Sequence, residues 1–155
     1  MPDCDVEQAV GAVVGAAFGA AGQRCMALST VVFVDGGGDG NGGKSRRERF
    51  LEMLVERAKG LVVDGGFEEG VDVGPLISPE AVKRVEGLIE RAVSADGGEG
   101  IDEDKGGAEL VLDGRGYKPE KYPNGNWVSR IILSYYFSFF FFRYPVLSYR
   151  KISKE

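Results

Sequence analysis

Cys25 is the residue whose type and surroundings best suit chemistry. It stands in the stretch Phe18-Gly19-Ala20-Ala21-Gly22-Gln23-Arg24-Cys25-Met26-Ala27, where small neighbours let a substrate approach the thiol closely. A thiol in a turn after a helix can attack a carbonyl carbon while backbone N–H groups point at the carbonyl oxygen. The ordinary alternative for Cys25 is a small buried hydrophobic residue. Cys4 has no such surroundings and is interpreted as structural.

Arg24 directly precedes this thiol and is the second candidate. A guanidinium beside a nucleophile suits a substrate that carries a carboxylate. The alternative is a surface cation that interacts with the C-terminal end of the preceding helix. The sequence contains no histidine, so the chain alone cannot supply Ser-His-Asp or Cys-His catalysis or a zinc site that uses imidazole.

A rival candidate is a phosphate-binding loop at Gly38-Asp39-Gly40-Asn41-Gly42-Gly43-Lys44-Ser45. This segment satisfies G-x-x-x-x-G-K-S between a predicted strand and a predicted helix, and residues 110–113 resemble a magnesium-site strand. Against it, the glycine density indicates a flexible loop, and Arg46-Arg47-Glu48-Arg49 is very polar for a helix packed on a nucleotide-binding sheet. A third interpretation is a non-catalytic packing module whose acidic loops and helix faces serve only subunit contacts.

The elements that must position Cys25 are predicted from local patterns. Asp5 with Gln8 is a capping box that opens a helix to about Ala20. A β-branched strand is predicted at 28–35, helices from Ser45 and Ser78, and a short strand at 108–112. This alternation predicts an α/β fold with helices packed on a small sheet. The residues expected to pack are the stripe Gly11, Gly15 and Gly19 in the first helix, Phe50, Leu51, Leu54, Val55, Ala58 and Leu61 in the second, and Val82, Val85, Leu88, Ile89, Ala92 and Val93 in the third.

Composition argues against several classes of partner. With 155 residues and a net charge of −5, the chain is one domain in size and offers no basic surface for nucleic acid. Its two cysteines cannot form a disulfide framework, and a helix between them would hold them far apart, which favours a reducing compartment. We recognise no targeting segment, and no apolar run reaches the roughly 20 residues that cross a bilayer.

The composition changes abruptly at Ser129. The apolar run 131–138 leads into four phenylalanines at 139–142, and nothing in the chain obviously covers a strand there. We interpret 129–155 as an aberrant, aromatic-rich tail translated from non-coding sequence, since Val128-Ser129 suits a splice-donor-like GTAAGT. Met1 is interpreted as an internal methionine of a longer protein. The preceding domain, 1–128, contains two predicted flexible loops at 36–44 and 96–107.

The segment Gly-Gln-Arg-Cys-Met-Ala-Leu-Ser-Thr at 22–30 resembles the nucleophile segment of the aldehyde dehydrogenase superfamily. It is most similar to the acylating, coenzyme-A-dependent methylmalonate-semialdehyde dehydrogenase branch. Gly74-Pro75-Leu76-Ile77-Ser78-Pro79 and Tyr122-Pro123-Asn124-Gly125-Asn126 are further landmarks, so 1–128 resembles an internal fragment of the catalytic domain. The two glycine-rich loops are longer than the family pattern, and Val128-Ser129-Arg130 stands where a Gly-Pro-Thr-like turn is expected.

This resemblance implies that Cys25 forms a thioester with the substrate, NAD being the hydride acceptor and coenzyme A the acyl acceptor. The implied substrates are the small molecules malonate and methylmalonate semialdehyde, whose carboxylate Arg24 would bind. The implied products are acetyl-CoA and propionyl-CoA with loss of carbon dioxide, in valine and pyrimidine breakdown. The resemblance further implies a mitochondrial location; without the resemblance, the expected location is the cytoplasm. It also implies that the full-length proteins of the family form homo-oligomers. The family's NAD-binding domain has no counterpart in this sequence, so the isolated chain is predicted to be inactive.

Overall fold

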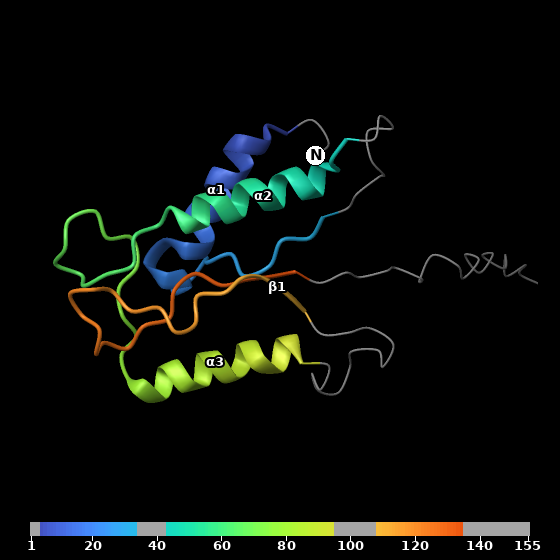
Figure 1. Ribbon diagram of the computed structural model, residues 1–155. Helices are drawn as coiled ribbons and strands as arrows, with labels where there is room; N and C mark the ends of the chain where they lie inside the picture. The colour runs from blue at the N-terminus through green and yellow to red at the C-terminus, as the bar shows by residue number, and fades with distance from the viewer. Residues whose placement is uncertain (1–3, 34–42, 95–107, 135–155) are drawn as a thin grey trace, which may run out of the picture.

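The computed structural model describes residues 4–33, 43–94 and 108–134. In chain order their elements are helix α1 (Val6–Phe18), the 3-10 turn η1 (Gly19–Gly22), helices α2 (Arg46–Lys59) and α3 (Pro79–Val93), and strands β1 (Glu109–Leu112) and β2 (Ile132–Ser134). Helices α1 and α2 pack side by side, and in Figure 1 extended segments run between this pair and α3. The predicted flexible loops fall almost entirely outside the described residues.

Helix α2 supplies most of the core because its apolar residues recur on one face. Phe50, Leu54 and Ala58 are buried at spacings that place them on one side of the helix. They meet Val10 of α1 and Ile132 of β2 in one cluster. Burying a large apolar side chain contributes roughly 1.5–3 kcal/mol, so this cluster is what fixes the glycine-containing α1 in place.

The predicted helix starts are confirmed by their caps. The Asp5 carboxylate accepts a hydrogen bond from the Gln8 amide at 3.1 Å, and the Ser78 side chain caps α3. At α2 the capping box is reciprocal, since Ser45 Oγ accepts from the Glu48 N–H at 3.2 Å and Glu48 Oε2 accepts from the Ser45 N–H at 2.8 Å. These contacts satisfy backbone donors that have no partner inside a helix.

The predicted strand at 108–112 is confirmed as β1, which pairs antiparallel with β2. Leu110 lies opposite Leu133 and Leu112 opposite Ile132, so the register shifts by one residue and leaves Val111 extra on β1. The pairing carries Ile132 to the core formed by α1 and α2.

The predicted strand at 28–35 is wrong for its described part, residues 28–33. These residues run extended, but they form no ladder with any described strand. β-Branched residues favour extended backbone, whereas a strand also needs a hydrogen-bonded neighbour. Instead, the Leu28 N–H donates to the Ala16 carbonyl of α1 at 3.1 Å, and the Phe33 ring contacts Phe50 edge-on with centroids 4.9 Å apart.

The apolar stripe predicted for α3 is buried only in part. Ile89 is buried, whereas Leu88 is 48% exposed and Val93 is also exposed. Helix α3 stands away from the α1–α2 pair in Figure 1, so its apolar positions do not share the main core.

Residues 129–134 are packed into the fold. The Ser129 N–H donates to the Gly114 carbonyl at 2.8 Å, Arg130 Nη2 donates to the Lys59 carbonyl at 2.9 Å, and β2 follows. A Cβ at Gly114 would lie 2.4 Å from the Ser129 carbonyl carbon, so the two backbones cross in close contact. The expectation that nothing covers a strand at 131–138 is therefore wrong for 132–134. The aberrant-tail interpretation stays a prediction, and beyond residue 134 it lies outside the described residues.

Candidate active site

Cys25 lies exposed in a turn that follows η1 at the C-terminal end of α1. The turn is closed by a hydrogen bond from the Ala27 N–H to the Arg24 carbonyl at 3.1 Å. The next residue, Leu28, is bonded back to the Ala16 carbonyl of α1. The thiol is thus presented to solvent from a backbone that is tied to the helix on both sides. The alternative of a buried hydrophobic cysteine is wrong in this structure.

Three consecutive residues before the turn adopt left-handed backbone. Ala20 has φ 50°, Ala21 φ 54° and Gly22 φ 69°. Left-handed backbone costs an L-residue roughly 1–2 kcal/mol, and only glycine adopts it freely. Strained backbone of this kind concentrates at functional sites. Gly22 offered a sequence signal for this conformation, but nothing in two alanines predicts a positive φ.

Arg24 is folded back onto the end of α1. A Cβ at Gly19 would lie 2.8 Å from Arg24 Cζ and Nη1 and 2.9 Å from Nη2, so the guanidinium rests against the glycine. At the other end of the predicted glycine stripe, Gly11 receives Arg57 Nη1 of α2, while the space above Gly15 is open. The predicted packing is thus confirmed only at the two ends of the stripe, where arginine side chains lie against Gly11 and Gly19, and it is wrong for Gly15.

Cys4 lies at the opposite end of α1 and is also exposed and free. Its carbonyl and its Sγ both accept hydrogen bonds from Arg46 Nη2, the latter at 3.5 Å. Among the described residues, Arg46 donates a hydrogen bond to the Cys4 sulfur, whereas the Arg24 guanidinium rests against Gly19. Sequence reasoning missed this pairing, because its partners are 42 residues apart.

A second polar cluster joins the loop after α2 to the segment before Trp127. Glu68 accepts hydrogen bonds from Lys121 Nζ at 2.5 Å and from the Tyr122 hydroxyl at 2.8 Å. The Lys121 hydrogen bond, followed by that of Tyr122, lowers the pKa of Glu68 below its ordinary value. The same carboxylate raises the pKa of Lys121 and that of Tyr122.

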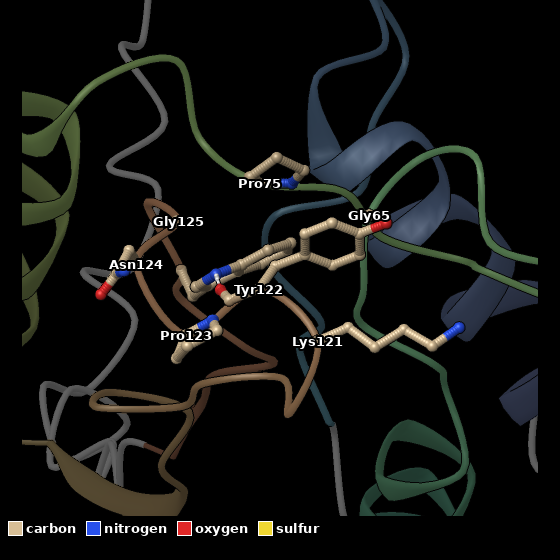
Figure 2. Close-up of a pocket in the computed structure, with 8 residues that line it drawn as sticks. Gly65, Pro75, Lys121, Tyr122, Pro123, Asn124 and Gly125 are labelled. Carbon is tan, nitrogen blue, oxygen red and sulfur yellow. Dashed lines mark hydrogen bonds between the residues drawn. The ribbon is translucent and has the colours of Figure 1, made fainter.

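This cluster borders an open hollow of about 400 Å³. Figure 2 shows Tyr122 along it, with Pro75 and Gly65 on the facing segments, and Trp127 also lines the hollow. The Trp127 indole N–H donates to the Tyr122 carbonyl at 2.7 Å, so that polar group is already satisfied. The hollow combines aromatic and proline surface with few free polar groups, and it lacks an arrangement for acid–base or nucleophilic chemistry.

The described residues of the rival phosphate-binding loop make contacts with other protein groups. Lys44 Nζ pairs with Glu52 at 2.7 Å, and Ser45 Oγ caps α2. Asp113, at the end of the segment 110–113 that resembles a magnesium-site strand, pairs with Arg115 at 2.6 Å. That hydrogen bond lowers the pKa of Asp113. Residues 38–42 lie outside the described residues, and Lys44 and Ser45 are engaged in surface contacts.

The part of the chain that the structure describes forms one two-stranded antiparallel sheet. A dinucleotide crevice needs parallel strands joined through a helix, so these residues do not fit NAD by themselves. Among them no cluster of three metal-ligating side chains occurs, and none of their helices has the length and apolarity to cross a membrane.

The comparisons with known proteins define the class. The sequence matches the profile of the Aldehyde dehydrogenase family over residues 1–136, so the chain belongs to that family. The match extends past residue 128 and includes β2.

Particular relatives narrow the class. The chain is 45% identical over 134 residues to the methylmalonate-semialdehyde/malonate-semialdehyde dehydrogenase (acylating, mitochondrial) of Rattus norvegicus, covering 86% of this chain and 21% of the rat protein. It is 42% identical to the acylating, mitochondrial methylmalonate-semialdehyde dehydrogenase of Arabidopsis thaliana, covering 86% of this chain and 19% of that protein. The chain thus spans about a fifth of the length of these curated relatives.

Solved structures of aldehyde dehydrogenases also resemble this chain. The methylmalonate-semialdehyde dehydrogenase of Oceanimonas doudoroffii aligns with a TM-score of 0.66 at 32% identity, over 86% of this chain and 23% of its own. A Sinorhizobium meliloti protein assigned to the same enzyme and solved with NAD aligns with a TM-score of 0.66 at 33% identity over the same shares. The predicted resemblance and the predicted fold, a partial α/β catalytic domain, are confirmed.

Proposed function

We propose that this chain is the nucleophile-bearing part of an NAD-dependent, coenzyme-A-acylating methylmalonate/malonate-semialdehyde dehydrogenase. The observation that carries the proposal is the exposed Cys25 thiol in the turn after α1, in a chain that belongs to the aldehyde dehydrogenase family. The names of the rat and Arabidopsis relatives support the substrate and the acylating reaction. The NAD bound in the Sinorhizobium structure supports the hydride acceptor.

Cys25 would act as the nucleophile. Its thiolate forms a C–S bond with the aldehyde carbon, and the carbonyl π electrons move to oxygen as an oxyanion. We propose that the backbone N–H of Cys25 donates a hydrogen bond to that oxygen. Loss of a hydride from the same carbon yields a thioester, and attack by an external thiol breaks the C–S bond and frees Cys25. When bound, NAD supplies the hydride acceptor and coenzyme A supplies the thiol.

Arg24 would bind the substrate carboxylate, because a guanidinium matches a carboxylate in charge and shape. The semialdehydes of malonate and methylmalonate carry that group, and acetyl-CoA and propionyl-CoA with carbon dioxide are the products we propose, in valine and pyrimidine breakdown. The mitochondrial names of the relatives support the same location here. Assembly of the full-length protein as a homo-oligomer belongs to the proposal as well.

Two assays test this function. The purified chain with malonate semialdehyde, NAD and coenzyme A should form no NADH above background, since its described residues hold no dinucleotide site. Turnover that Cys25→Ala abolishes would contradict this inactivity. The rat enzyme carrying residues 22–30 of this chain should keep NADH formation and lose it on Cys25→Ala. A folded but inactive chimera would contradict the nucleophile role.

A further inference from the structure

We propose that Gly19 is a positioning residue that seats the guanidinium of Arg24 and thereby sets where a substrate carboxylate is received beside Cys25. This inference rests on the proposed function, in which Arg24 binds the carboxylate. It adds a residue that touches neither substrate nor thiol and acts only through Arg24.

The geometry of the contact carries the inference. A Cβ at Gly19 would be almost equally far from Arg24 Cζ, Nη1 and Nη2, at 2.8, 2.8 and 2.9 Å. Nearly equal distances to these three atoms mean that the glycine meets the flat face of the guanidinium, since an edge-on approach would leave Cζ farther away. The face can lie there only because position 19 has no side chain.

No other described side chain competes for this guanidinium through a hydrogen bond or ion pair. Helix α1 carries no basic residue in its last turn, and a cation at a helix C-terminus is favoured by the helix dipole. The contact with Gly19 and the dipole of α1 therefore both hold the Arg24 guanidinium at the C-terminal end of α1. Its N–H donors remain available to bind an anion.

The chain contains a matched control for Gly19. Gly15 lies one turn earlier on the same stripe and has nothing within 4 Å of a Cβ. Gly19 itself has φ −56° and ψ 130°, which alanine adopts without strain. Gly19→Ala should thus fold normally and displace only the flexible end of Arg24.

The test uses two alkylating probes of Cys25 in the purified 155-residue chain. Iodoacetate carries a carboxylate and iodoacetamide does not, so the ratio of their rates reports the cation near the thiol. Peptide mass spectrometry measures the iodoacetate rate divided by the iodoacetamide rate at each cysteine, and the value at Cys25 is then divided by the value at Cys4. We expect Arg24→Ala to lower this normalised ratio about two- to fivefold, the range for an exposed charge pair.

Gly19→Ala should lower the ratio toward the Arg24→Ala value, and Gly15→Ala should leave it unchanged. In the Arg24→Ala background, Gly19→Ala should have no further effect, because it acts through Arg24. Arg24→Lys keeps the charge without the flat face and should behave like Gly19→Ala, which gives a second variant if Gly19→Ala fails to fold. Circular dichroism checks the fold of each variant.

Two outcomes distinguish the positioning role of Gly19 from the carboxylate-binding role of Arg24. If Arg24→Ala lowers the ratio while Gly19→Ala and Arg24→Lys match the wild type, the positioning role is overturned and the role of Arg24 stands. If Arg24→Ala leaves the ratio unchanged, the proposed carboxylate role of Arg24 is overturned as well.

Discussion

The two ends of α1 each present an exposed cysteine, and they do so in opposite ways. Cys4 precedes a conventionally capped helix start, and its sulfur accepts a hydrogen bond from Arg46 of α2. Cys25 follows a helix end that is distorted by left-handed residues, and its neighbouring arginine is turned onto Gly19. The Cys4 sulfur is thus hydrogen-bonded by an arginine that is distant in sequence, whereas the arginine next to Cys25 in sequence rests its guanidinium against Gly19.

The two ends differ in what fixes the cysteine in place. At the Cys4 end, the Arg46 side chain of α2 donates hydrogen bonds to the carbonyl and the sulfur of Cys4, just before α1. At the Cys25 end, backbone constraint presents the thiol, and the side chains around it stay open to solvent. We therefore expect the reactivity of Cys25 to depend both on the α1–α2 core and on the turn itself, which can be changed by separate substitutions.

A substitution in the core should destabilise the fold that supports both ends of α1, whereas a substitution on the exposed side of α3 should not. Leu54 is buried in the cluster shared by α1, α2 and β2, so Leu54→Ala should lower the free energy of unfolding by about 2–5 kcal/mol. Leu88→Ala on α3, where Leu88 is 48% exposed, should change it by about 0.5 kcal/mol or less. Denaturant titrations measure both, and equal losses would contradict the placement of the core.

Glycine substitutions should have different effects on stability in α1 and in η1. Ala12→Gly lies on the exposed face of α1 and should lower the free energy of unfolding by about 1 kcal/mol. Ala21→Gly replaces an alanine at φ 54°, and the relief of backbone strain should leave stability unchanged or raise it by up to about 1 kcal/mol. Thermal unfolding compares them, and a clear loss in Ala21→Gly would contradict the left-handed turn.

Acid should loosen the end of α2 that approaches Cys4. Hydrogen bonds from the Ser45 backbone, and then its side chain, lower the pKa of Glu48 below its ordinary 4.5. Because the folded state holds the depressed pKa, this contribution is present above 4.5 and is lost as pH falls through the lower folded value. Glu48→Gln can keep the hydrogen bond but cannot titrate, so stability should fall less between pH 7 and pH 3 than in the wild type. An identical pH dependence would count against the capping box.

Local signals were enough to predict part of this architecture. Asp5, Ser45 and Ser78 marked three helix starts because a cap involves residues three positions apart. The segment 22–30 marked Cys25 through its resemblance to a known family. The short strand β1 followed from its apolar run.

The remaining features depend on tertiary contacts that local patterns do not encode. Arg24 meets Gly19 only because the chain reverses through two alanines with positive φ. Residues 28–33 have the composition of a strand, but pairing depends on a neighbour. Residue 132 joined the core because β1 supplies an edge, although the aromatic run after it suggested a foreign tail.

The most direct test of the central claim compares the alkylation rates of the two thiols by iodoacetamide at neutral pH. Peptide mass spectrometry of the folded chain should show Cys25 reacting faster than Cys4, because the turn after η1 presents the Cys25 thiol to solvent. A guanidinium beside a sulfur favours the reactive thiolate, so Arg46→Ala, which removes the guanidinium at Cys4, should widen the gap between the two rates, and denaturant should remove it. Equal or reversed rates in the folded wild type would contradict the assignment of Cys25 as the nucleophile.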